Sequence, residues 1–243
     1  MLIATGFVAG IINTLAGGGS NLTLPALMLT GMPADIANAT NRVGIFLQCA
    51  VGIGGYKKHD KINTDDLIPV LIPTLIGGAV GALAASSLPA TLLKPILLGS
   101  MLTVAFIILV FPSVVVPPEG TPIVKMKDRP LAWAALFVAG VYGGFVQAGV
   151  GFILITALAG TLRYDLVRTN ALKLICSFAF TAVALAVFLY HDLVLWLPGL
   201  VLAVAMMMGA AVAVNISLNI SQNMMKWFLF VMTLAASAAA MFL

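Results

Sequence analysis

Charged residues are scarce in this chain of 243 residues: they make up 8% of it, while apolar residues make up 62%. A typical soluble domain contains about 25% charged residues. A soluble protein so poor in charge could not cover its own surface, whereas a bilayer requires an apolar outer face. The composition therefore excludes an ordinary soluble domain and indicates an all-α polytopic membrane protein, in agreement with the mean hydropathy of +1.14.

Cysteine and histidine are also rare, with two residues of each. Cys49 and Cys176 both lie in apolar runs, so we expect them to pack in the core rather than to form a disulfide framework. The two histidines lie in polar breaks and lack metal-ligand spacing. The run Gly17-Gly18-Gly19-Ser20 has no lysine after it, as a phosphate-binding loop would require. We therefore expect no enzyme, no metal and no cofactor.

The net charge of +4 does not predict nucleic-acid binding. Most lysines and arginines lie in short breaks between apolar runs, which is typical of the cytoplasmic loops of a membrane protein. Residues 1–8 lack the basic start of a signal peptide, so we expect the first apolar run to be retained. The lipid bilayer is therefore the expected surroundings, and no nucleic-acid partner is expected.

Ten apolar runs alternate with polar breaks, five on either side of one Pro-rich polar stretch. The runs cover 1–16, 21–32, 34–56, 67–87 and 90–116, then 131–148, 151–162, 164–190, 193–215 and 222–243. The polar stretch, 117–130, is the longest hydrophilic segment and reads as a linker. We therefore divide the chain into a first repeat, 1–116, the linker 117–130 and a second repeat, 131–243.

The two halves also match residue by residue, at an offset between 129 and 132. The matched pairs are Phe7-Val8-Ala9-Gly10 with Phe137-Val138-Ala139-Gly140, the glycine-rich break at 17–21 with that at 147–151, Thr40-Asn41 with Thr169-Asn170, His59-Asp60 with His191-Asp192, and Lys94 with Lys226. Five matches in order at one spacing indicate a duplication.

The lengths of the runs leave two arrangements open. A hydrocarbon core about 30 Å thick needs about 20 helical residues. Runs 34–56, 67–87 and 90–116 and their partners qualify as full spans, but 21–32 and 151–162 are too short. Each short run either continues the run before it as one glycine-broken span, giving eight spans, or turns back as a re-entrant hairpin, leaving three full spans in each half.

The basic residues favour the hairpins. With an odd number of spans per half the repeats are inverted, and nine basic residues then share one side of the membrane: Lys57, Lys58, Lys61, Lys125, Lys127, Arg129, Arg163, Arg168 and Lys226. Parallel halves would leave Lys94, Arg163, Arg168 and Lys226 opposite the others. The positive-inside rule prefers the inverted arrangement, which is also a common plan of transporters.

The glycine-rich breaks are the first candidate site. Glycine interrupts a helix, and irregular backbone at membrane depth is tolerated where it lines a cavity. The helices that follow Gly18, Gly19, Ser20 and Asn21 in one half, and Gly149 and Gly151 in the other, would point positive N-terminal ends into the protein. Close packing of helices through small residues is the alternative explanation.

Two cations inside predicted spans complete the candidate site. Arg42 lies about 12 Å along its run, which is marginal for snorkelling, and Lys173 lies at a similar depth. A cation within a membrane span is costly and indicates function. With neutral hydrogen-bonding side chains nearby, the cations predict a site for a small oxyanion. These side chains are Asn41, Gln48, Gln147 and Asn170.

The order of these motifs is similar to that of a known family. The carrying residues are 6–10, 16–19, 22–27, 31–34 and Thr40-Asn41 in the first half, and 143–145, 149–152 and 169–173 in the second. They resemble the TauE/SafE sulfite exporter family over nearly the whole chain. The resemblance implies transport of sulfite, thiosulfate or a sulfonate such as sulfoacetate across a bacterial inner membrane. Ser20-Asn21 departs from the family, in which many members continue with glycine.

The resulting hypothesis is a multi-pass secondary transporter for a small sulfur oxyanion or sulfonate, working by alternating access. An anion channel whose filter is formed by the glycine breaks is the second reading. A membrane scaffold subunit for sulfur metabolism is the third, and the short loops disfavour it because they leave little surface for a soluble partner. Assembly into a homo-oligomer is compatible with all three.

Overall fold

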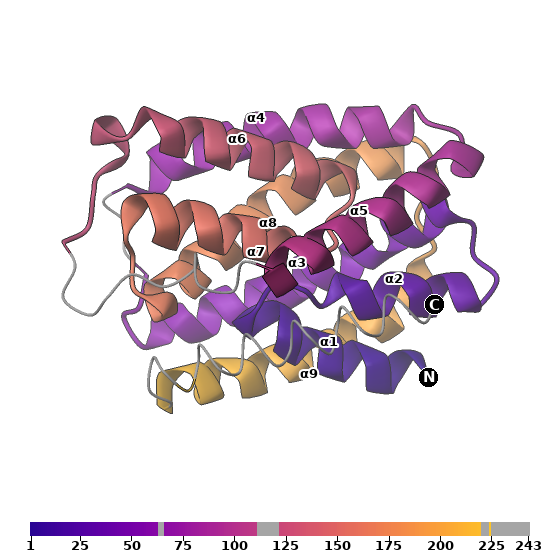
Figure 1. The fold of residues 1–243 in the computed structure, drawn as a ribbon. Helices are drawn as coiled ribbons and strands as arrows, with labels where there is room; N and C mark the ends of the chain where they lie inside the picture. Colours follow the sequence, from indigo (N-terminus) through magenta and orange to yellow (C-terminus); the bar gives the residue numbers. More distant parts are fainter. Residues whose placement is uncertain (63–65, 111–121, 220–223, 225–243) are drawn as a thin grey trace.

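The computed structural model describes residues 1–62, 66–110, 122–219 and 224, and every regular element in these ranges is helical (Figure 1). The first half contains α1 (Leu2–Leu15), α2 (Ser20–Leu29), α3 (Ala34–Lys58), α4 (Leu67–Ser86) and α5 (Ala90–Val110). After the short 3-10 helix η2 (Met126–Asp128), the second half contains α6 (Pro130–Phe145), α7 (Val150–Ile155) with its π-helical continuation η3 (Thr156–Thr161), α8 (Leu166–Tyr190) and α9 (Trp196–Asn219). Residues 111–121 of the predicted fifth run and linker, and nearly all of the final run 222–243 with Lys226, lie outside the described residues.

Three helices within the described ranges are long and apolar enough to cross a membrane: α4, α8 and α9. Their mean hydropathy in the best window is 2.1, 2.3 and 2.2. Helix α3 is as long as α8, with 25 residues, but its buried face carries Asn38, Asn41, Arg42 and Gln48. The chain is therefore a helical membrane protein, and one of its longest helices has a polar face turned toward the protein.

The first two helices fold back on each other. A Cβ at Gly19 would meet the carbonyl oxygen of Ala9 and lie 2.7 Å from Cβ of Asn13. Ten residues of straight helix would instead separate Gly19 from Ala9 by about 15 Å. Gly17 makes the turn with a φ of 86°, a left-handed conformation that glycine adopts without a steric penalty. Helices α1 and α2 are therefore a hairpin, called the first hairpin below, and not one continuous broken span.

The corresponding helices of the second half fold back in the same way. A Cβ at Gly143 would lie 3.0 Å from Cγ2 of Val150, seven residues later. The Tyr142 hydroxyl donates to the carbonyl of Ala148 at 2.7 Å and closes the turn. Gln147 takes the place of Gly17 here, with a φ of 69°. Helices α6, α7 and η3 are called the second hairpin, and Figure 1 shows the two hairpins entering the bundle from opposite ends.

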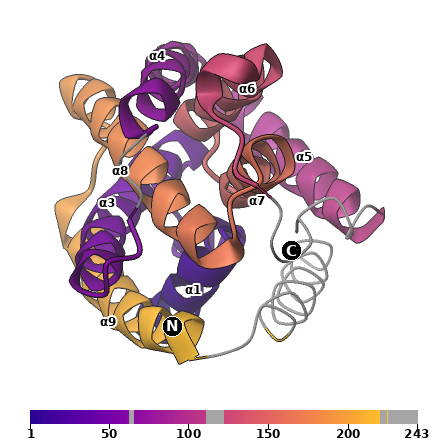
Figure 2. The same ribbon diagram turned by 90° about the vertical axis from the view of Figure 1, so that its left-hand side faces the viewer.

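Each hairpin packs against a long helix of the other half. Helix α1 lies along α9, and α6 lies along α4, as both views show (Figures 1 and 2). A Cβ at Gly10 would collide with the backbone of Met206, and a Cβ at Gly140 would collide with the backbone of Thr74. Small residues at these positions let the helix backbones approach closely, as in other membrane bundles. The two halves are thereby interlocked.

The tips of the two hairpins meet inside the bundle. The Gly17 and Gly151 backbones are in direct contact, and the Gly151 N–H donates to the Gly17 carbonyl at 3.3 Å. Helices α3 and α8 pack against each other, where Phe46 and Phe178 stack with ring centroids 4.4 Å apart. The centre of the protein therefore contains two hairpin tips and two long helices, one of each from either half.

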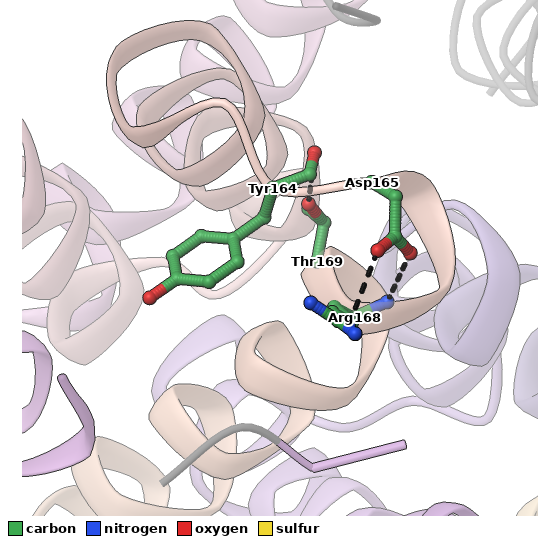
Figure 3. Close-up of polar contacts among 4 residues, drawn as sticks. All are labelled: Tyr164, Asp165, Arg168 and Thr169. Carbon is green, nitrogen blue, oxygen red and sulfur yellow. Dashed lines mark hydrogen bonds and ion pairs between the residues drawn. The ribbon is translucent and has the colours of Figure 1, made fainter. Parts of the chain in front are cut away.

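The start of α8 is fixed by a cap that Figure 3 shows. Asp165 precedes the helix and accepts the backbone N–H of Arg168 at 3.0 Å, and its second oxygen lies 3.3 Å from Arg168 Nε. The Thr169 hydroxyl donates to the Tyr164 carbonyl at 3.2 Å. A carboxylate at the N-cap satisfies an orphan N–H and complements the helix dipole. The cap sets the register of α8 and so places Asn170 and Lys173 on its buried face.

Candidate functional site

The core of the bundle carries positive charge without acidic partners. Arg42 is 0% exposed and Lys173 is 1% exposed. Among the described residues no aspartate or glutamate is buried. Both side chains are thus enclosed by the protein and do not extend along its surface. Two unit charges are therefore held away from water, and most of their hydrogen-bond partners are backbone carbonyls.

Arg42 caps the C-terminal end of α6. Its Nη1 donates to the Gly143 carbonyl at 2.5 Å and to Oε1 of Gln147, and its Nη2 donates to the Gly144 carbonyl at 2.9 Å. The last carbonyls of a helix have no partner within it and form the negative end of its dipole. The guanidinium also lies 5.5 Å from the centroid of the Phe188 ring, a cation–π contact.

Lys173 caps the C-terminal end of α1. Its Nζ donates to the carbonyls of Asn13 and Thr14, at 3.0 and 2.8 Å, and to Oδ1 of Asn170 at 2.9 Å. Asn13 and Thr14 precede Gly143 and Gly144 by 130 positions. Each cation therefore caps the first helix of the opposite half. No side-chain pattern in the sequence signalled these partners, because every residue carries the same carbonyl.

Asn41 and Gln48 tie α3 to the first hairpin. Asn41 accepts from the Thr23 hydroxyl at 2.7 Å and donates to Ser20 Oγ at 3.2 Å. Gln48 donates to the Thr14 hydroxyl at 2.7 Å and accepts from Asn13 Nδ2 at 2.5 Å. Gln147, at the tip of the second hairpin, accepts from the Thr181 hydroxyl at 3.1 Å as well as from Arg42. The predicted side chains thus come together at the hairpins. Most of their hydrogen-bonding groups are bound to other residues of the protein.

Four polar residues of this network were not predicted: Asn13, Thr14, Thr23 and Thr181. All four are buried polar side chains inside predicted apolar runs. Buried polar groups in a membrane span need hydrogen-bond partners. The sequence could therefore have predicted that these threonines and Asn13 take part in the network, by the same argument that singled out the cations.

Three of the predicted glycines, Gly18, Gly19 and Gly151, are in close contact with the opposite hairpin or with their own. Gly18 faces the Phe152 ring, Gly19 lies against α1, and Gly151 lies against Gly17. Gly149 has a left-handed φ of 74°. The N–H of Asn21 donates to the Gly18 carbonyl at 3.1 Å. Gly18, Gly19 and Gly151 thus lie in closely packed parts of the hairpins.

Two buried N–H donors remain without a partner among the described side chains: Arg42 Nε and Asn170 Nδ2. A buried polar group left unsatisfied costs about 1–3 kcal/mol. The two helix ends together offset about one of the two positive charges, since each dipole end carries about half an elementary charge. The remaining positive charge and these two N–H donors are the groups with which an anion would pair. No three His, Cys, Asp or Glu side chains gather as a metal site in the described ranges.

Known proteins are similar to this chain over nearly its whole length. The family model "Sulfite exporter TauE/SafE" matches residues 2–240. A probable membrane transporter protein of Haemophilus influenzae is 26% identical over 240 residues, which cover 98% of this chain and 92% of that protein. A probable membrane transporter protein of Sinorhizobium sp. is 24% identical over 237 residues, or 96% and 88% of the two chains. The probable membrane transporter protein YfcA of Escherichia coli K12 is 24% identical over 245 residues, or 100% and 89%.

These relatives are named as membrane transporters and not as enzymes, and they align with this chain over nearly its whole length. The helical bundle, its apolar long helices and the family match together assign the chain to one class of protein. It is a membrane transporter that belongs to the TauE/SafE sulfite exporter family.

Proposed function

We propose that this protein is a multi-pass secondary transporter of the bacterial inner membrane that moves a small sulfur oxyanion or organosulfonate by alternating access. One observation supports the anion above all others. Among the described residues the core holds two buried cations and two N–H donors that have no partner, and no aspartate or glutamate is buried as a whole residue; Asp35 is partly exposed and has one buried oxygen. An oxyanion supplies both the missing charge and the missing acceptors.

The proposed architecture is a pair of inverted repeats. Left-handed residues recur at matching positions: Gly17 with Gln147, Gly31 with Arg163, and Asp60 with Asp192. The offsets are 130 and 132, as in the sequence alignment. The contacts α1–α9 and α6–α4 recur in the same way. In this arrangement each re-entrant hairpin reaches the middle of the bilayer from its own side, with three full spans in each half.

The proposed orientation places one basic end in the cytoplasm. The Val124 N–H donates to the Leu162 carbonyl at 3.0 Å, and the Met126 N–H donates to Asp66 Oδ2 at 3.3 Å. These bonds bring the linker, the end of η3 and the start of α4 to one end of the bundle. Eight basic residues lie in or beside these segments: Lys57, Lys58, Lys61, Lys125, Lys127, Arg129, Arg163 and Arg168. The positive-inside rule assigns this end to the cytoplasm.

Contact between the hairpin tips favours a carrier over a channel. The backbones of Gly17 and Gly151 touch, so the space between the tips is closed at this point. A carrier opens to one side at a time by moving one bundle against the other. In such a motion each hairpin would move together with the helix of the other half that holds it, α3 through Arg42 or α8 through Lys173.

Flux into proteoliposomes tests the proposed function. Purified protein is reconstituted, and uptake of sulfite, thiosulfate, sulfate and sulfoacetate is measured with and without a pH gradient. We expect saturable uptake of at least one of the three sulfur compounds other than sulfate. Absence of flux for the whole panel contradicts transport by this chain and favours a scaffold subunit, whereas flux that does not saturate favours a channel.

A further inference from the structure

The two buried cations differ in the number of hydrogen-bond donors that they have left. An ammonium group has three N–H donors, and Lys173 makes three hydrogen bonds, to Asn13, Thr14 and Asn170. A guanidinium has five N–H donors, and Arg42 makes three hydrogen bonds. Nε–H and one N–H of Nη2 therefore remain on Arg42, while Lys173 has no donor left.

Building on the proposed function, we propose that the two cations have different roles. Arg42 binds the transported anion through Nε and Nη2, and Lys173 is a positioning residue that holds Asn170 and the end of α1. Nε and Nη2 lie on one edge of the planar guanidinium, and such an edge matches two oxygens of an oxyanion. The opposite side is occupied, because Nη1 donates to both Gly143 and Gln147.

The surroundings of Arg42 hold the free edge in place. Phe188 lies 5.5 Å from the guanidinium carbon, and Gln147 is itself fixed by the Thr181 hydroxyl. The side chain is 0% exposed, so bulk water does not compete for Nε. A ligand fixed by packing and by a second layer of hydrogen bonds needs little reorganisation on binding. Arg42 is therefore a preformed anion ligand.

Lys173 acts through Asn170. An asparagine amide has one acceptor end and one donor end. Because Oδ1 of Asn170 accepts from Lys173 Nζ at 2.9 Å, its Nδ2 is turned away and carries the second unpartnered N–H of the core. Without Lys173 this amide is free to rotate. Its Nδ2 is then no longer held in place, and the affinity for the anion falls.

Arg42→Lys separates capping from anion binding. The lysine ammonium has enough donors for Gly143, Gly144 and Gln147 but none left for an anion. We expect a folded protein whose affinity for sulfite, thiosulfate or sulfoacetate, measured by calorimetry in detergent, falls at least about 10- to 100-fold, the value of one of the two charged hydrogen bonds that are lost. Arg168→Lys, on the exposed start of α8, is the matched control and leaves the affinity unchanged. Wild-type affinity in Arg42→Lys overturns the proposal.

A double-mutant cycle tests the role of Lys173. If Lys173 acts through Asn170, Lys173→Met weakens binding in the wild-type background but adds less than about twofold in the Asn170→Ala background. Fully additive losses overturn the positioning role. Should Lys173→Met not fold, Lys173→Arg still supplies donors for Asn13, Thr14 and Asn170, and we expect it to lose less affinity than Arg42→Lys. A loss as large as that of Arg42→Lys also overturns the proposal.

The wild-type protein separates the two possible failures. If it binds none of the three sulfur compounds and shows no flux, the proposed function is wrong and the division of roles falls with it. If the wild-type protein binds and transports, but Arg42→Lys does so equally well, only the assignment of the ligand is wrong.

Discussion

The N–H of Gly151 donates to the carbonyl of Gly17 at 3.3 Å, so the two hairpin tips are joined through their backbones. A side chain on either residue would collide with the backbone of the other. The contact joins a segment of the first half to a segment of the second, and the proposed alternating-access motion would have to change it.

The first prediction concerns this contact. Gly17→Ala places a Cβ against Gly151 and also forces alanine into a φ of 86°. Overpacking and backbone strain each cost about 1–3 kcal/mol, so we expect a lower melting temperature in detergent and loss of transport. Gly54→Ala is the control, since no atom lies within 4 Å of a Cβ there. Unchanged stability and transport in Gly17→Ala would show that the tips do not pack as described.

The second prediction concerns the bond between Gln48 and Asn13. Gln48→Leu keeps the size of the side chain but leaves Asn13 Nδ2 without its acceptor, whereas the Thr14 hydroxyl still donates to the Gly10 carbonyl at 2.8 Å. We expect a loss of about 1–3 kcal/mol in the free energy of unfolding, because the buried Asn13 amide N–H is then unsatisfied. Removing both partners in Gln48→Leu/Asn13→Leu should recover part of the loss. A double variant whose loss is the sum of the two single losses would indicate that the residues do not interact.

The third prediction concerns the cap of α8. Asp165→Ala removes the acceptor for the Arg168 N–H and should cost about 0.5–2 kcal/mol, the usual value of an N-cap. Asp165→Asn keeps an oxygen acceptor and loses only the ion pair with Arg168, an exposed pair worth at most about 1 kcal/mol. Thermal unfolding in detergent should therefore rank Asp165→Asn above Asp165→Ala. The reverse order would contradict the cap.

The fourth prediction concerns orientation. His59 and His191 are matched residues of the two halves, and both are exposed. With inverted repeats they lie on opposite sides of the membrane. In intact cells a membrane-impermeant thiol reagent should label His191→Cys at once and His59→Cys only after permeabilisation. The native cysteines, Cys49 and Cys176, are buried and give little background. Labelling of both variants from one side would establish parallel halves.

Much of the fold could be predicted from the sequence, because helix breaks at glycine and the lengths of apolar runs depend on neighbouring residues only. The break at Gly17 predicted an interruption, and the chain turns there. The repeat predicted a second interruption, although a non-glycine residue, Gln147, makes that turn. Runs of about 20 apolar residues became α4, α8 and α9. The π-helical continuation of α7 was not predicted, because no composition distinguishes it from an α-helix.

The candidate site was predicted only in part. Burial of Arg42 and Lys173 followed from their position in long apolar runs, and both are buried. Their partners could not be predicted, because the carbonyls of Gly144 and Thr14 become acceptors only where a helix of the other half happens to end. The sequence suggested two equivalent anion ligands, whereas the hydrogen bonds distinguish one cation with free donors from one without.

Counterflow of radiolabelled sulfite tests the central claim most directly. Proteoliposomes are loaded with unlabelled sulfite and diluted into a trace of labelled sulfite, with Arg42→Lys as the parallel sample. A carrier with a central anion site predicts a transient accumulation of label above equilibrium in the wild type and little or none in Arg42→Lys. Simple equilibration of label without an overshoot, or no entry of label with any of the sulfur anions, would contradict the account.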